Sequence, residues 1–356
     1  MDFLLLLFPV LLIPKMKIAP RGTYFDSLSK ENSQILKGIC AVVIVFAHMS
    51  SNAMNIAKPD MIFKNLMFIG VYAVSVFFLF SGYGLSISYI KKGNAYLSGF
   101  FKNRFISLLV PFFIMLVLYN AELISEGKFS WDYFFFSVID GSPLNVRYSW
   151  YVAVITLFYI LFYFAARFAK DSKPKLIAAV VCALCVYIAL CYAFSIPSHY
   201  FSSVIAFLFG VIIACFKEKA ETAVRNRWSL FAAVSVILLA ASLVFRAVKG
   251  GMLSNAVVKQ IASISTIYLN EIFLISVILI FMQKLSFNNA ALRFLGSISY
   301  ELYLTHGLVI VLLKKTVLVE NCWIFAFSVL LLSAVSAYLL HLLSTAVIKR
   351  LRGVKA

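Results

Sequence analysis

Length, composition and charge exclude most classes of protein. The chain has 356 residues, of which 63% are hydrophobic and 13% charged, and its mean hydropathy is +0.97. Soluble domains are about half apolar and a quarter charged, so a water-soluble enzyme, a secreted disulfide scaffold and a disordered tail are all excluded. The apolar runs are long and continuous, which predicts an all-α integral membrane protein rather than a barrel.

The formal net charge of +18 comes from 32 lysines and arginines against 14 acidic residues. The basic residues lie in short gaps between apolar runs, as expected of cytoplasmic loops that face anionic lipid headgroups. No basic strip with interleaved aromatic residues lies outside these runs, so we expect a lipid bilayer and no nucleic acid as partner.

The apolar runs predict ten membrane spans after a short N-terminal run. Residues 3–13 are too few to cross a bilayer and precede their basic residues, which predicts an interfacial or packed helix rather than a signal peptide. The predicted spans lie near residues 35–52, 66–90, 105–121, 148–168, 176–196, 199–216, 230–248, 261–282, 291–313 and 322–348.

Loop charges predict the orientation of these spans. With the N-terminus inside, most of the 32 basic residues fall on the inner side, so both termini are predicted to be cytoplasmic. The longest loop, near residues 122–147, then lies outside. Its Trp131 and Tyr133 favour an aromatic anchor at the membrane surface over the alternative, a role in substrate binding.

Two cysteines form a C-x-x-C pattern inside an apolar run. Cys182 and Cys185 have no second pair and no histidine near them in the sequence. We therefore expect buried, small apolar side chains rather than redox chemistry, and no metal site.

Ionisable residues within membrane spans are costly, so each is a candidate functional residue. Four stand out, namely His48, Glu271, Glu301 and His306. A secondary transporter or flippase could use such groups as well as an enzyme could, although no inverted repeat is visible in the sequence.

The first span places a cation and an imidazole on one stripe. Lys37 and His48 are eleven residues apart, which separates them by ~20° around a helix and ~16 Å along it. This spacing suits an extended ligand with an anionic head at Lys37 and a reactive tip at His48, because histidine is a fitting general base near neutral pH. The alternative is a lysine that extends to the membrane surface and one polar residue packed between helices.

The stretch GSISYELYLTH, residues 296–306, is a second polar constellation. Tyr303 and His306 share a helical face, whereas Glu301 and His306 do not. These polar side chains either line a cavity or hydrogen-bond between helices.

Arg104 lies near the inner start of the third span, where it could bind phosphate or only set the topology.

Five stretches in order give the chain a family resemblance. They are ILKGICAVVIVFAH, VFFLFSGYGLSISY, NRFISLLVPFF, SWYVAVITLFYI and LGSISYELYLTH. Their order, spacing and hydropathy resemble the acyltransferase 3 family of multi-spanning membrane O-acyltransferases. The resemblance divides the chain into an N-terminal cytoplasmic or interfacial segment (1–34), a transmembrane domain (35–348) and a basic cytoplasmic tail (349–356).

The resemblance implies a fold and an activity. About ten helices surround a central cavity in the cell inner (plasma) membrane. Acyl-CoA, most simply acetyl-CoA, enters from the cytoplasm as a donor substrate, and no cofactor is permanently bound. The acceptor is a hydroxyl of a cell-surface or lipid-linked glycan or glycolipid.

The resemblance also implies roles for individual residues. His48 matches the family's catalytic histidine, and Lys37 stands where the family has an arginine. Arg104 matches the first arginine of a pair before Pro111, and Ser107 occupies the second position. Lys37 and Arg104 would hold the donor phosphates.

The chemistry at His48 is open between two routes. His48 could act as a general base or could itself accept the acyl group, and His306 either shares the acid–base role or packs. Ser81, Tyr300 or Tyr303 could stabilise the oxyanion, while Glu271 and Glu301 could line the cavity. The Lys37 and Ser107 replacements also leave open a homologue that has lost its chemistry.

Overall fold

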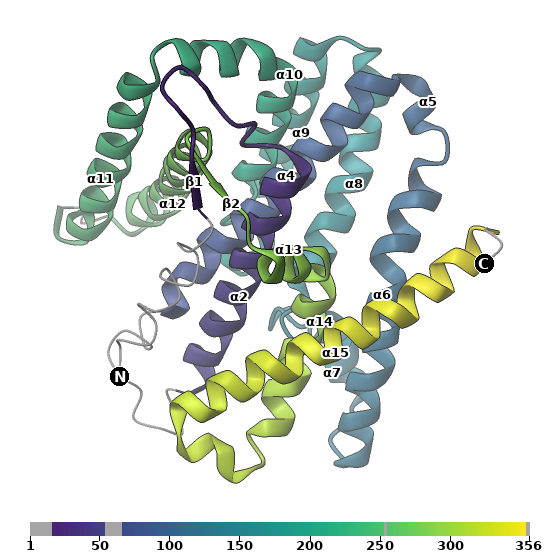
Figure 1. Ribbon diagram of the computed structural model, residues 1–356. Helices are drawn as coiled ribbons and strands as arrows, with labels where there is room; N and C mark the ends of the chain where they lie inside the picture. The colour runs from purple at the N-terminus through teal and green to yellow at the C-terminus, as the bar shows by residue number, and fades with distance from the viewer. Residues whose placement is uncertain (1–15, 54–65, 253–254, 354–356) are drawn as a thin grey trace.

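The computed structural model describes residues 16–53, 66–252 and 255–353, and the predicted helix at residues 3–13 lies outside them. Most of the described chain is helical (Figure 1). The elements are β1 (Met16–Ile18), α2 (Lys30–Ala53), η2 (Leu66–Ile69), α4 (Gly70–Lys92), α5 (Asn94–Leu97), α6 (Phe100–Ser125), α7 (Trp131–Phe136), η3 (Pro143–Asn145), α8 (Trp150–Ala169), α9 (Lys173–Ala193), η4 (Ser198–Tyr200), α10 (Ile205–Asn226), α11 (Trp228–Met252), α12 (Ala256–Phe281), β2 (Leu285–Phe287), α13 (Ala290–Ser297), α14 (Ser299–Leu313), η5 (Val317–Glu320) and α15 (Cys322–Leu351).

The described helices confirm a multi-span, all-α membrane protein. By length and composition, nine helices of the described residues could each cross a membrane, and a bent helix pair raises the number to ten. Many large apolar side chains point outward, as Ile237 and Val244 of α11 do. In a bilayer these side chains contact lipid tails, which makes their exposure favourable.

The ninth predicted span differs from a straight helix. Residues 291–313 form two helices, α13 and α14, that meet at Ile298 with a bend of 79°. The hydroxyls of Ser297 and Ser299 donate to the carbonyls of Phe294 and Gly296, at 2.7 and 3.0 Å. The Phe294 carbonyl also accepts from the Ile298 backbone N–H at 3.2 Å, so polar groups at the bend are hydrogen-bonded locally.

The helices differ in how deeply they lie within the bundle. About two thirds of the α2 span is buried, whereas α9 and α11 lie at the periphery.

The prediction that Cys182 and Cys185 are buried is wrong, because both are exposed. Helix α9 packs through the face that carries Val180 and Leu184, so the two cysteines face outward.

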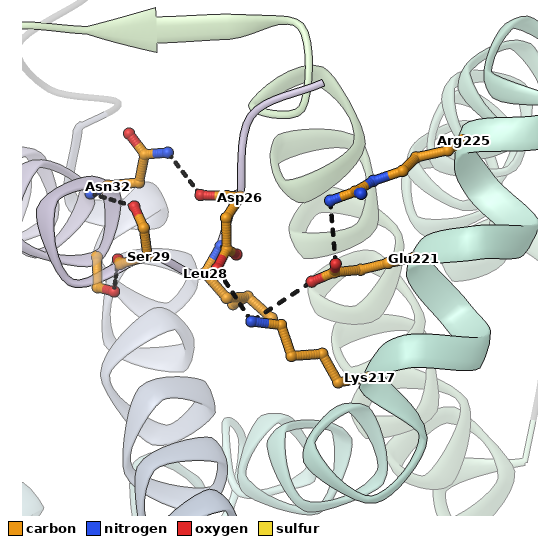
Figure 2. Close-up of polar contacts among 8 residues, drawn as sticks. Asp26, Leu28, Ser29, Asn32, Lys217, Glu221 and Arg225 are labelled. Atoms are coloured by element: carbon orange, nitrogen blue, oxygen red, sulfur yellow. Dashed lines mark hydrogen bonds and ion pairs between the residues drawn. The ribbon is translucent and has the colours of Figure 1, made fainter. Parts of the chain in front are cut away.

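The start of α2 is fixed by a polar network. Lys217 of α10 binds Asp26 at 3.0 Å and Glu221 at 3.5 Å, joining the segment before α2 to α10 (Figure 2). Asn32 donates from its side chain to the Asp26 carbonyl and from its backbone to the Ser29 hydroxyl, at 2.8 and 3.2 Å. Serine is a favoured N-terminal helix cap, so the sequence itself positions the helix that carries Lys37 and His48.

Two three-residue strands, which the sequence pattern did not predict, join the segment before α2 to the segment before α13. β1 and β2 pair antiparallel, with Lys17 opposite Ser286.

The predicted outer loop contains α7, where Trp131 and Tyr133 are exposed, as an aromatic membrane anchor requires.

Glycines allow α2 and α13 to approach closely. A methyl group on Gly38 would overlap the Leu292 carbonyl oxygen, and one on Gly296 would overlap the Gln34 carbonyl oxygen. Small residues permit such backbone contact between membrane helices.

We expect Gly296→Ala to destabilise the protein by about 1–3 kcal/mol, because a backbone atom must move to admit the methyl group. Thermal unfolding in detergent measures this effect. Gly84→Ala is the matched control, because a methyl group there meets no atom within 4 Å. Equal melting temperatures for the two variants would contradict the close packing of α2 on α13.

Candidate active site

A cavity of about 520 Å³ lies among α2, α4, α6, α8 and α14. It begins beside Asn103 and Ser107, which are exposed, and reaches the buried side chains of Ile44, Val74 and Tyr303. Along α4 its lining runs from Val74 to Leu85, a distance of ~16 Å in a helix. The cavity is therefore elongated, and its volume is in the range of small-molecule sites.

Among the residues that the structure describes, three basic side chains and no acidic side chain line this cavity. Lys37 lies 5.2 Å from the centroid of the Phe80 ring. Arg104 donates to the Tyr96 hydroxyl, at 3.0 Å from Nε and 2.6 Å from Nη2. Arg352 is the third cation, and we call Lys37, Arg104 and Arg352 the basic mouth. A group of cations without a carboxylate is suited to binding an anionic ligand.

Two histidines meet one helical turn beyond the cavity. His48 follows the lining residue Ile44 by four positions, and His306 follows Tyr303 by three. The Nδ1 of His48 lies 2.8 Å from the Nε2 of His306. His306 is fully buried, whereas His48 is half-buried although it does not line the cavity.

The hydrogen bonds of the pair assign its protons. The Leu302 carbonyl can only accept, so the Nδ1–H of His306 donates to it at 3.3 Å. In a neutral ring the Nε2 of His306 is then the acceptor, and the Nδ1–H of His48 donates to it. In this tautomer the basic lone pair of His48 is on Nε2.

A tyrosine holds the histidines in place. The ring of Tyr148 lies 3.9 Å from that of His48 and stacks on His306 at 5.5 Å. Its backbone has a φ of +61°, and its carbonyl accepts a hydrogen bond from the Tyr303 hydroxyl. A methyl group on Gly307 would lie 3.2 Å from the Tyr148 ring, so the glycine makes room for this turn.

The comparison with known families gives one match. An acyltransferase domain of the acyltransferase 3 family matches residues 31–342. The chain belongs to this family. No curated protein and no solved structure gave a match. The match makes the chain a membrane acyltransferase, and it spans both the basic mouth residues Lys37 and Arg104 and the histidine pair.

In this acyltransferase most of the predicted site residues gather in one place. Lys37, Arg104, Ser81, Tyr300 and Tyr303 all line the cavity. The predicted proximity of Tyr303 and His306 is confirmed, with ring centroids 5.8 Å apart.

Besides the two histidines, two predicted site residues do not line this cavity. Glu301 of α14 pairs with His341 of α15, at 2.8 Å between Oε1 and Nδ1. Glu271 is fully buried on α12. Neither carboxylate is among the residues that surround the cavity.

The hydroxyls of both tyrosines are already engaged. Tyr300 donates to the Leu108 carbonyl at 2.7 Å, and Tyr303 donates to the Tyr148 carbonyl. A phenol has one proton to donate, so neither group is available to an oxyanion in this arrangement. Ser81 is the remaining predicted donor in the cavity.

Three side chains near the site, Tyr148, Arg352 and His341, are not among the site residues predicted from the sequence. Tyr148 could not be found, because its place depends on a left-handed backbone turn. Arg352 was assigned to a basic tail, although it lines the cavity. His341 could have been predicted as a candidate, because it is an ionisable residue within a predicted span.

Proposed function

We propose that the protein is a membrane O-acyltransferase, most simply an O-acetyltransferase. It transfers an acyl group from cytoplasmic acyl-CoA to a hydroxyl of a cell-surface or lipid-linked polysaccharide. The observation that carries this proposal is the contact of His48 with His306 one turn beyond an elongated cavity with a basic mouth. A polyanionic donor with a long flexible arm fits that arrangement in charge and in length.

The donor binds along the cavity. Lys37 and Arg104 bind phosphate groups, Arg104 through a guanidinium already oriented by Tyr96. The pantetheine arm extends between α2 and α4 toward Ile44 and Val74. This directs the thioester toward His48, which lies one helical turn beyond the lining residue Ile44 and ~16 Å from Lys37 along α2.

Acyl transfer then proceeds with His48 as general base. Its Nε2 takes the proton from the acceptor hydroxyl, and the oxygen attacks the thioester carbonyl. The carbon–sulfur bond breaks, and the coenzyme A thiolate leaves and takes the proton from His48. In the alternative route Nε2 attacks the thioester carbonyl first, the carbon–sulfur bond breaks, and the coenzyme A thiolate leaves an acyl-imidazolium on His48. The acceptor oxygen then attacks the acyl carbon, His48 is released as the neutral imidazole, and the hydroxyl proton goes to the thiolate.

The two substrates approach from opposite ends of the bundle. The excess of basic residues in alternate loops supports cytoplasmic termini in a cell inner membrane, with the basic mouth on the cytoplasmic side. His48 is half-buried without lining the donor cavity, which suits an acceptor that arrives from the other side.

The donor site predicts a kinetic effect of Arg104. Arg104→Gln is expected to raise the KM for acyl-CoA by about tenfold to a hundredfold with little change in kcat, because it removes charge-assisted bonds made before the chemistry. Release of the coenzyme A thiol by purified protein measures both constants. Lys102→Gln is the matched control, because Lys102 is exposed and does not line the cavity. An unchanged KM in Arg104→Gln would contradict the assignment.

A transporter or flippase is the second candidate, favoured by the broken helix pair α13 and α14. The same thiol assay separates the two functions, because a transporter leaves the thioester intact. Absence of thiol release with every acyl-CoA and glycan acceptor tried would favour transport over acyl transfer.

A further inference from the structure

Arg352 comes to the cavity from the far end of the chain. It is the residue that caps the C-terminus of α15, a helix of 30 residues. Helix α15 runs obliquely across the bundle, and its C-terminal end lies beside α6 (Figure 1). A residue more than 200 positions from Lys37 and Arg104 thus lines the same cavity.

The guanidinium of Arg352 is anchored on one side. Its Nη2 donates to the Ser107 hydroxyl at 2.7 Å and to the Asn103 carbonyl at 2.9 Å. Its Nε is buried and has no hydrogen-bond partner within the described residues. A guanidinium carries five N–H donors, and the contacts with Ser107 and Asn103 use one nitrogen, so the group retains donors for an anionic ligand.

The charges around the cavity also favour an anionic ligand. Lys37, Arg104 and Arg352 place three positive charges on the lining of one cavity. In the described part of the chain, no carboxylate lines the cavity to offset them. Three cations match a ligand with three or more negative charges better than one with a single charge.

We propose that Arg352 is a third donor-binding cation, which completes with Lys37 and Arg104 a site for a ligand that carries several phosphate charges. This inference rests on the proposed acyl-CoA donor, whose diphosphate and 3′-phosphate provide such charges. Ser107 and Asn103 then act as positioning residues that hold the guanidinium at the basic mouth. The C-terminal turn of α15 is therefore part of the donor site rather than a topological signal alone.

Binding of two probes to the full-length protein tests this role. Coenzyme A carries the phosphates, whereas pantetheine carries only the neutral arm. Arg352→Gln is expected to raise the Kd for coenzyme A by about tenfold or more and to leave the Kd for pantetheine unchanged. Arg350→Gln is the matched control, because it removes the same charge from an exposed residue of the same helix end, and it should bind coenzyme A as the wild type does.

The outcomes distinguish the inference from the proposed function. If Arg104→Gln weakens coenzyme A binding and Arg352→Gln does not, the donor site stands and the role of Arg352 is overturned. If Arg352→Gln weakens both probes equally and lowers the melting temperature, Arg352 only clamps α15 to α6, and the inference is again overturned. If the wild type binds no coenzyme A, the proposed donor and this inference both fail.

Discussion

His48→Ala is expected to lower kcat for acyl transfer by about 10²- to 10⁴-fold, the usual contribution of a general base. His48 contacts His306 through its Nδ1, which leaves Nε2 as the basic nitrogen of the ring. The Kd for coenzyme A should stay within about twofold of the wild type, because the basic mouth lies ~16 Å away along α2. Thiol release by purified protein gives the rate, and binding is the internal control for folding.

Retention of wild-type kcat in His48→Ala would remove His48 from the chemistry. Loss of both kcat and coenzyme A binding would instead show that the substitution disturbs the bundle. In that case His48→Gln, which keeps a polar side chain of similar length, would decide between the two explanations.

The loss of kcat in a His306 variant is expected to depend on whether the new side chain can accept a hydrogen bond. His306→Leu removes the acceptor for the Nδ1–H of His48, so the imidazole loses the bond that sets its tautomer. We expect kcat to fall on the order of 10²-fold with the KM for acyl-CoA unchanged. His306→Gln offers an amide oxygen to the same N–H and should retain more than a tenth of the wild-type kcat.

The comparison of the two His306 variants carries the test. Equal losses in both would mean that His306 itself exchanges a proton with substrate, and the positioning role would be wrong. Wild-type rates in both would mean that His306 only packs. Melting temperatures measured alongside the rates control for the loss of a buried hydrogen bond.

The sequence predicted those features of the site that depend on one helix. Lys37 and His48 share a stripe because helical periodicity alone sets their relation, and the capped start of α2 keeps that helix regular. The same holds for Tyr303 and His306 on α14. Hydropathy likewise predicted the spans, because a bilayer demands long apolar helices.

Features that depend on how helices meet could not be predicted in this way. Arg352 reaches the cavity only because α15 runs toward α6, a direction that hydropathy does not encode. The bend at Ile298 follows from local serine contacts and from the glycine contact with α2, and a span profile averages over both. The outward face of Cys182 and Cys185 is set by which side of α9 packs.

Mass spectrometry of surface glycans tests the central claim most directly. Cells that lack the protein would be compared with cells that carry the wild type or His48→Ala at matched membrane levels. The account predicts an acyl mass increment with the wild type alone, and its size identifies the donor acyl group. The same increment in all three strains, or in wild type and His48→Ala alike, would contradict acyl transfer by His48.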